Sequence, residues 1–302
     1  MTPDDTDCDR EDQDVAESID APGLRTARVP YAGQMDLHAL LTMGQTFAWR
    51  RQGDAYHGSV RGTCLRVALD ESSIVGAGAC AAGDLEATVR EYFDADLDLP
   101  ALQEELSADE HVAAAVARHP GLRVLHQPLW ECLASFILST VNNIPRIQRI
   151  VDRLSDEFGE RSRLPNGRPG FPTAEALADV PTDRLYECGT GFRARGLSEA
   201  ARAMANGELD EAHLRSAPLD EARARLVSLY GVGDKVAGCI LLYGLGRFEA
   251  FPVDVWIKRE MERLYFDARE VAPATIRDFA QERFGEWAGY AQVYLFHGAR
   301  KR

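Results

Sequence analysis

The sequence contains very little lysine. Of its 34 basic residues only Lys235, Lys258 and Lys301 are lysine, and the other 31 are arginine. Cysteine is also sparse, with six residues scattered over 302 positions and no C-x-x-C pair. This argues against a zinc or iron–sulfur site, and an intracellular chain should keep such thiols reduced. Because lysine is so rare in this chain, a lysine inside a motif indicates a specific chemical role.

Long apolar runs and a signal segment are missing too. The longest nearly apolar stretch, around residues 236–245, is too short to cross a bilayer. No positively charged and then apolar segment opens the chain. We therefore expect a cytoplasmic protein that does not bind membranes, and the 45% apolar and 27% charged residues are typical of a soluble globular chain.

The net charge of −14 alone disfavours nucleic acid as a partner. However, residues 1–21 hold nine acids and one arginine, which leaves about −6 for the remaining chain. Residues 1–22 are acidic and short of large apolar groups, so we expect a disordered acidic tail. Many acids, many arginines and few lysines favour a salt-loving host, with simple GC bias as the alternative. The charge distribution leaves DNA binding open.

Two patterns divide the remaining chain. Between about residues 35 and 78, the turn "QGDA" and the alternation in "TCLRVAL" predict an antiparallel sheet. From about residue 84 the period is helical: residues 144–158 place apolar side chains on one face, and "PLWECLASFILSTV" predicts a buried central helix. The predicted fold class is α+β, with an N-terminal antiparallel sheet domain over 23–105 and an all-α body over 106–302.

A glycine hairpin stands between two predicted helices, "DEARARLVSL" and "DKVAGCILLYG". Its turn, "YGVG", contains Gly231 and Gly233. In such a hairpin successive backbone N–H groups point outward and can hold a phosphate, which binds DNA without reading its sequence. An ordinary helix–helix turn is the alternative.

Lys235 lies in the first turn of the second helix, where the helix dipole disfavours an ammonium ion and favours a nucleophilic amine. Arginine could replace it as a phosphate ligand but cannot form an imine, so the lysine indicates covalent chemistry; a phosphate-binding or solvated lysine is the alternative. Nineteen residues later, Asp254 occupies a predicted helix N-cap. Beside the lysine, its carboxylate would stabilise an oxocarbenium ion at a deoxyribose C1′.

These motifs resemble the helix-hairpin-helix, Gly/Pro-rich loop and aspartate signature of base-excision DNA glycosylases. "GQTFAWR", "ECLASFILSTVNNIPRI", "GFRARGLSEAARA" and "AQVYLF" extend the likeness over roughly residues 35–297, and the chain is similar to the 8-oxoguanine DNA glycosylase family. The resemblance implies two helical subdomains that flank an active-site cleft. It also implies a bifunctional enzyme, in which Lys235 attacks C1′ of a flipped 8-oxoguanosine, Asp254 assists, and β-elimination nicks the abasic site.

The resemblance further implies a pocket for the extruded base. The family sandwiches the base between residues that correspond to Cys239 and Phe296, and reads its Watson–Crick edge with the residue that corresponds to Gln292. The carbonyl at Gly44 would accept the N7–H of 8-oxoguanine, a donor that guanine lacks. Without the family context, core packing explains Cys239 and Phe296 equally well.

A third set of positions corresponds to family DNA contacts. Val141 replaces the first asparagine of the family's run, a departure that bears on how strictly cytosine is required opposite the lesion. Trp256 and Ala299 together replace a histidine and the aspartate that supports it. For the arginines of the set, a solvated surface position is the alternative. The predicted DNA-binding residues are Asn142, Asn143, Arg146, Phe192, Arg193, Gly231, Gly233, Val255 and Trp256.

The resemblance implies no organic or metal cofactor. The four cysteines of the iron–sulfur branch have no counterpart after Cys239. The carbonyl groups of the hairpin could bind a monovalent cation. The expected partner is double-stranded DNA that contains oxidised guanine, bound by a monomer associated with the nucleoid of a prokaryote. Two alternatives remain open: a glycosylase of the same superfamily for another damaged purine, and a non-catalytic helix-hairpin-helix DNA-binding protein.

Overall fold

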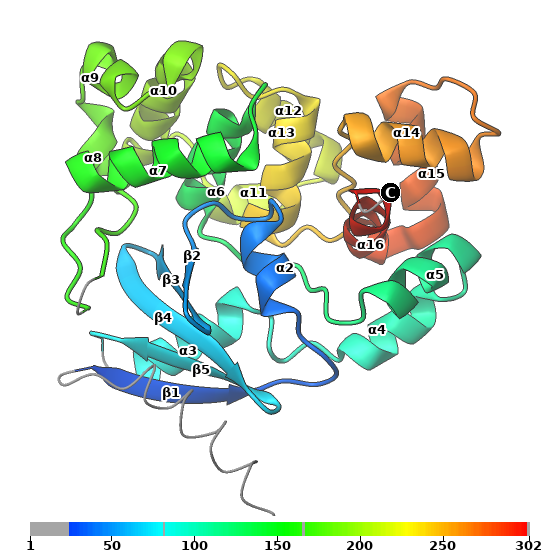
Figure 1. Cartoon of the computed structure of the whole chain (residues 1–302). Helices are drawn as coiled ribbons and strands as arrows, with labels where there is room; N and C mark the ends of the chain where they lie inside the picture. Colours follow the sequence, from blue (N-terminus) through cyan, green and yellow to red (C-terminus); the bar gives the residue numbers. More distant parts are fainter. Residues whose placement is uncertain (1–23, 81, 165–166, 301–302) are drawn as a thin grey trace, which may run out of the picture.

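The computed structural model describes residues 24–80, 82–164 and 167–300 (Figure 1). The predicted acidic tail, residues 1–22, lies outside them. Within this part of the chain, no helix is long and apolar enough to cross a membrane.

A five-stranded antiparallel sheet forms the N-terminal part of the molecule, as predicted. Its strands lie in the order β1-β5-β4-β3-β2, so β2 to β5 form a meander and β1 pairs with β5 at the edge. The helix α3 (Ala82–Tyr92) packs on β1 and β5. The strands are β1 (Arg25–Pro30), β2 (Arg50–Gln52), β3 (Ala55–Val60), β4 (Thr63–Asp70) and β5 (Ser73–Gly78).

Two features of this part differ from the sequence prediction. The strand β1 precedes the predicted sheet region, and residues 37–42 form the helix α2 (Leu37–Thr42) where strands were expected. Asp36 caps α2 by accepting a hydrogen bond from the Ala39 N–H at 2.9 Å, and Leu37, Leu40 and Leu41 are buried. Their spacing is helical, so capping and burial together override the strand pattern of the surrounding segment.

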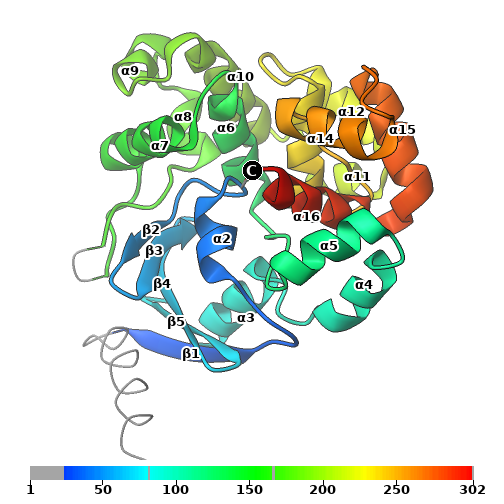
Figure 2. The same ribbon diagram turned by 45° about the vertical axis from the view of Figure 1, so that its right-hand side comes forward.

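The remainder of the chain is helical, and the predicted α+β class is confirmed. Figures 1 and 2 show α6 between two groups of helices, one containing α7 to α10 and the other α11 to α16. The bounds are α4 (Leu99–Leu106), α5 (Glu110–Arg118), α6 (Leu129–Ser139), α7 (Ile144–Phe158), α8 (Ala174–Ala178), α9 (Thr182–Glu187), α10 (Ala194–Ala205), α11 (Glu211–Ser216), α12 (Leu219–Val227), α13 (Asp234–Cys239), α14 (Val255–Tyr265), α15 (Pro273–Phe284) and α16 (Ala288–Arg300).

The central helix α6 is buried along nearly its whole length, which confirms the prediction from its apolar sequence. It packs against α7, α10 and the π-helical segment Ile240–Gly244 that continues α13. Buried Ile147, Ile150, Val151 and Leu154 line the inner face of α7, as their spacing predicts. This packing holds the segment between α6 and α7 beside the start of α13.

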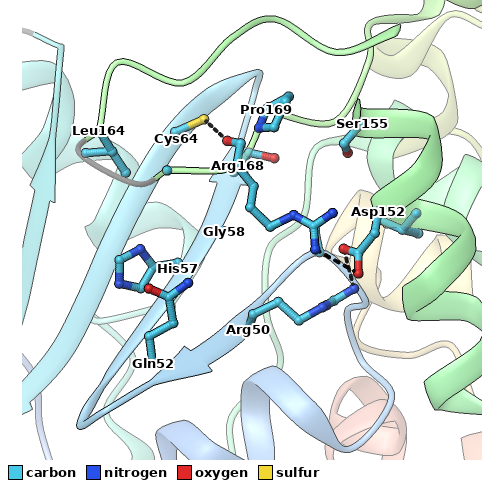
Figure 3. A pocket seen from close by; sticks show the side chains of 14 residues that line it. Arg50, Gln52, His57, Gly58, Cys64, Asp152, Ser155, Leu164, Arg168 and Pro169 are labelled. Atoms are coloured by element: carbon cyan, nitrogen blue, oxygen red, sulfur yellow. Dashed lines mark hydrogen bonds and ion pairs between the residues drawn. The ribbon is translucent and has the colours of Figure 1, made fainter. Parts of the chain in front are cut away.

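Ion pairs join the sheet to α7. Asp152 on α7 accepts hydrogen bonds from Arg50 of β2 at 2.7 Å and from Arg168, which precedes α8, at 3.0 Å. Figure 3 shows both guanidinium groups turned toward this carboxylate, at a small cavity of about 30 Å³. Arg50 also donates to the Gln148 carbonyl at 2.7 Å. The sheet therefore fixes the position of α7, and with it the loop that precedes the helix.

A second junction is built on a partly buried carboxyl group. Glu131, in the first turn of α6, contacts the turn between β3 and β4. Its carboxyl accepts a hydrogen bond from the Gly62 N–H at 3.4 Å. Burial raises the pKa of Glu131 to about 7, against the opposing effects of the backbone N–H groups of Gly62 and Arg61 and of the Arg61 charge.

Candidate active site

The glycine hairpin exposes its backbone to solvent. Gly231 has φ +84°, a conformation that favours glycine, and Gly233 is the extended N-cap of α13. Both glycines are exposed, whereas Val232 between them is buried at 4% exposure. The valine anchors the turn, and the peptide groups on either side of it are accessible to a phosphate.

Lys235 and Asp254 meet in one pocket, as the sequence predicted they could. This pocket has a volume of about 630 Å³ and lies between the α6–α7 loop, the hairpin and the start of α14. Asp254 is the N-cap of α14 and accepts a hydrogen bond from the Ile257 N–H at 2.8 Å. The Lys235 amine lies 5.0 Å from the ring centroid of Phe136, a cation–π contact that sequence reasoning missed.

The thiol of Cys239 lies beside the same lysine. Burial raises the pKa of Cys239; the charge of Lys235 and a hydrogen bond with it oppose this effect, and the charge of Asp254 adds to it. The buried thiol is therefore kept neutral, and a neutral thiol is a poor nucleophile.

The remaining residues of the predicted base pocket, Gly44, Gln292 and Phe296, do not line that pocket. Gly44 has φ +108°, and a Cβ placed there would lie 3.4 Å from Cδ1 of Ile144 at the start of α7. The loop that carries Gly44 also places Phe47 edge-on to Phe136, with ring centroids 5.6 Å apart. Phe136, which contacts the Lys235 amine, therefore also contacts the loop that carries Gly44.

Gln292 and Phe296 lie one turn apart on α16. Gln292 is only 5% exposed, and its carboxamide oxygen has no hydrogen-bond partner among the described residues. Phe296 is partly buried against the core. Because an unsatisfied buried acceptor is costly, Gln292 is poised to receive a donor from a ligand.

Several of the predicted DNA-contacting side chains around the α6–α7 loop form hydrogen bonds within the protein. Asn143 caps α7 by accepting from the Arg146 N–H at 3.0 Å, and Asn142 donates to the Leu138 carbonyl at 2.9 Å. Arg193 is 4% exposed, and its guanidinium donates to the carbonyl oxygens of the neighbouring loop instead of facing solvent. Sequence gave no signal for this internal use of the arginine.

Other predicted contacts project into solvent. Phe192 is 58% exposed, Val255 61% and Trp256 54%, and Arg146 is also exposed. Val255 and Trp256 are exposed apolar side chains that line the open pocket, and such a cluster marks an interaction surface. Of the predicted residues, the pocket lining includes Lys235, Asp254, Asn142, Gly231, Gly233, Val255 and Trp256. It does not include Gly44, Cys239, Gln292, Phe296, Asn143, Arg146, Phe192 or Arg193.

Fold and pocket together define a DNA glycosylase of the helix-hairpin-helix class, and the family comparisons agree. Residues 134–285 match the HhH-GPD superfamily of base excision DNA repair proteins. Residues 29–133 match the N-terminal domain of 8-oxoguanine DNA glycosylase. The chain belongs to the 8-oxoguanine DNA glycosylase family. This confirms the predicted enzyme class, a DNA glycosylase with lyase activity.

Individual relatives cover most of the chain. A probable N-glycosylase/DNA lyase of Methanothermobacter thermautotrophicus is 33% identical over 239 residues, 72% of this chain and 75% of that protein. The N-glycosylase/DNA lyase of Saccharomyces cerevisiae is 32% identical over 74% of this chain and 69% of its own length. A Clostridium acetobutylicum 8-oxoguanine glycosylase/lyase, solved with double-stranded DNA containing cytosine opposite 8-oxoguanine, superposes with a TM-score of 0.84 at 33% identity, covering 92% of this chain and 96% of that one.

Proposed function

We propose that this protein excises 8-oxoguanine from duplex DNA and then cuts the strand at the resulting abasic site. The observation that carries the proposal is the convergence of Lys235 and Asp254 in one open pocket beside an exposed glycine hairpin. The DNA complex of the Clostridium acetobutylicum relative supports duplex DNA as the partner. Hairpin amides would hold the backbone phosphates while the damaged nucleotide enters the pocket.

The chemistry follows from the two side chains. The lone pair of the Lys235 amine attacks C1′ of the flipped nucleotide and forms a bond to it. The bond from C1′ to the base breaks, and the base keeps the electrons of that bond and takes up a proton, while Nζ loses one. Asp254, with its negative charge beside C1′, stabilises the positive charge that develops on the sugar. The sugar ring then opens to give an imine between Nζ and C1′. Loss of a proton from C2′ expels the 3′-phosphate, and water hydrolyses the imine to free the lysine.

Selection of the oxidised base would fall to the residues that correspond to the family's base pocket. The buried, unpartnered oxygen of Gln292 can accept a hydrogen bond from a base edge. Cys239 and Phe296 supply apolar faces for the ring, and the carbonyl of Gly44 is assigned to the N7–H. A site of this kind rejects guanine because the unmodified base would leave a buried acceptor unpaired.

Borohydride trapping tests the proposal. A duplex that carries one 8-oxoguanine opposite cytosine should yield a covalent protein–DNA adduct, and Lys235→Gln should abolish it. Lys258→Gln is the matched control, because Lys258 lines the same pocket but its ammonium is bound to Glu262 at 2.6 Å; its adduct should persist.

The alternatives give distinct outcomes in the same assay. Release of free base without an adduct would show a monofunctional enzyme and another role for Lys235. Duplexes with alkylated or deaminated purines test the glycosylase for a different lesion. DNA binding with neither adduct nor released base, on any of these substrates, would refute excision and leave a binding protein.

A further inference from the structure

Asp234 puts a negative charge where the proposed function needs a phosphate to bind. It stands between Gly233 of the hairpin and Lys235, and all three line the same pocket. The Asp234 side chain is 60% exposed. A carboxylate at this place would repel the DNA backbone, and it would compete with a phosphate for the same peptide N–H groups. DNA binding therefore requires that this carboxylate be held aside.

The N–H groups at the hairpin are not taken up by a side chain of the hairpin itself. Gly233 is the N-cap of α13 and makes no side-chain cap hydrogen bond, and Val232 is apolar and buried. An aspartate in the first turn of a helix is the ordinary substitute, because its short side chain can fold back onto nearby N–H groups. In this chain the Asp234 carboxylate is instead drawn to another helix.

That helix is α15, which supplies Arg277. Nη1 of Arg277 lies 3.7 Å from Oδ2 of Asp234, an ion pair between segments that are distant in the sequence. The arginine side chain is only 16% exposed, and it does not line the pocket. The ion pair therefore holds the carboxylate toward α15, at the edge of the pocket.

Arg223 on α12 adds a second positive charge near this pair. It is 7% exposed, and its Nε and Nη1 atoms have no hydrogen-bond partner among the described residues. Burial lowers the pKa of Arg223, the charge of Arg277 lowers it further, and the charges of Asp234 and Asp220 oppose this. Arg223 therefore lies within electrostatic reach of both members of the ion pair. A buried guanidinium with unpaired donors is costly, which indicates that its charge serves a purpose other than stability.

We propose that Arg277, supported by Arg223, is a positioning residue that holds the Asp234 carboxylate off the hairpin amides and so keeps them open to a DNA phosphate. The inference rests on the proposed function, because it requires that the hairpin bind the DNA backbone. Arg277 acts through Asp234 and not on the phosphate itself. Its removal should therefore matter only while the carboxylate is present.

A double-mutant cycle tests this dependence. Dissociation constants are measured by fluorescence anisotropy, between about 0.05 and 0.2 M KCl, for a duplex with a tetrahydrofuran abasic analogue, which is bound without excision. Arg277→Gln should weaken binding by about fivefold or more. It should also make the dependence of log Kd on log salt concentration shallower, by up to about 0.9, the value of one phosphate contact. Asp234→Ala should bind as tightly as the unaltered protein or more tightly, and adding Arg277→Gln to it should change Kd by less than about twofold.

Two further variants serve as controls, and thermal unfolding shows that each variant is folded. Asp84→Ala also removes an exposed acid from the first turn of a helix, but α3 lies at the opposite end of the molecule from α12 in Figures 1 and 2. It should leave binding unchanged and should not rescue Arg277→Gln. Arg277→Met keeps a long side chain in α15 without its charge, so it should bind as weakly as Arg277→Gln and be rescued by Asp234→Ala.

Binding that is unchanged in both Arg277 variants would overturn the inference. So would a loss of affinity that persists in the Asp234→Ala background, because Arg277 would then act on the DNA directly. Failure of the proposed function looks different: the cycle would hold with the abasic duplex, while 8-oxoguanine is neither released nor trapped. A protein that binds no duplex at all would overturn both.

Discussion

Glu131 lies where the helical body meets the sheet, and its partly buried carboxyl should make stability depend on pH. Its pKa is raised from an ordinary 4.5 to about 7 by burial. Between these pH values the folded chain holds a proton that the unfolded chain has released. Because proton binding then favours the folded state, stability falls as the pH rises through this window.

The size of the effect follows from the two pKa values. Their difference corresponds to about 3 kcal/mol of unfolding free energy, at about 1.4 kcal/mol for each pH unit. The cost of ionising Glu131 is absent below pH 4.5 and complete above pH 7. Glu131→Gln keeps an acceptor for the Gly62 N–H and removes the charge, so it should be free of this cost at every pH.

Urea denaturation of both proteins between pH 4 and pH 8 measures the difference directly, because other titrating groups are common to both and cancel. We expect Glu131→Gln to be about 3 kcal/mol more stable, relative to the unaltered protein, at pH 8 than at pH 4. A difference that stays constant over this range would show that the pKa of Glu131 is the same in the folded and the unfolded chain, and would refute the reasoning.

Three further variants probe the site. Asp254→Asn should keep α14 capped, since asparagine caps as well as aspartate, yet slow single-turnover excision by about 10²-fold or more through loss of the charge. Gln292→Leu should leave the unfolding free energy unchanged or higher, because the buried oxygen lacks a partner among the described residues, and should slow excision of 8-oxoguanine, while the preference over guanine assigned to the Gly44 carbonyl is kept in a competition assay. Trp256 is 54% exposed whereas Trp49 is fully buried, so DNA should quench tryptophan fluorescence in the native protein but not in Trp256→Phe; equal quenching in both would contradict contact at Trp256.

Sequence reasoning succeeded where the signal is local. The period of α7, the apolar composition of α6 and the cap at Asp254 each depend on a few neighbouring residues, and each was predicted correctly. The edge strand β1 was missed because its burial alternates weakly, with Val29 as its fully buried side chain. α2 was missed because a short capped helix lay inside a segment read as strands.

Contacts between distant segments could not be predicted in this way. The apolar residues of α6 all read as core, so nothing in the sequence distinguishes Phe136 as the ring beside the Lys235 amine. Nothing in the sequence around Arg193 distinguishes it from a surface arginine. In the structure, however, its guanidinium is buried and donates to the Thr140 carbonyl, some fifty residues earlier in the chain. Such roles depend on how α6, η1 (Gly191–Arg193) and α13 meet in space.

The scarcity of lysine has a consequence for how the protein tolerates its own reaction product. An abasic site carries an aldehyde that condenses with any accessible neutral amine, so a lysine-rich surface would invite misplaced cross-links to damaged DNA. In the described chain, Lys258 is held as an ammonium ion, because its hydrogen bond with Glu262 is the main factor that raises its pKa, and Glu270 adds to it. Arginine supplies nearly all the remaining positive charge without forming imines. Under the proposed function, this composition leaves Lys235 as one of only three lysine side chains that could form an imine with abasic DNA.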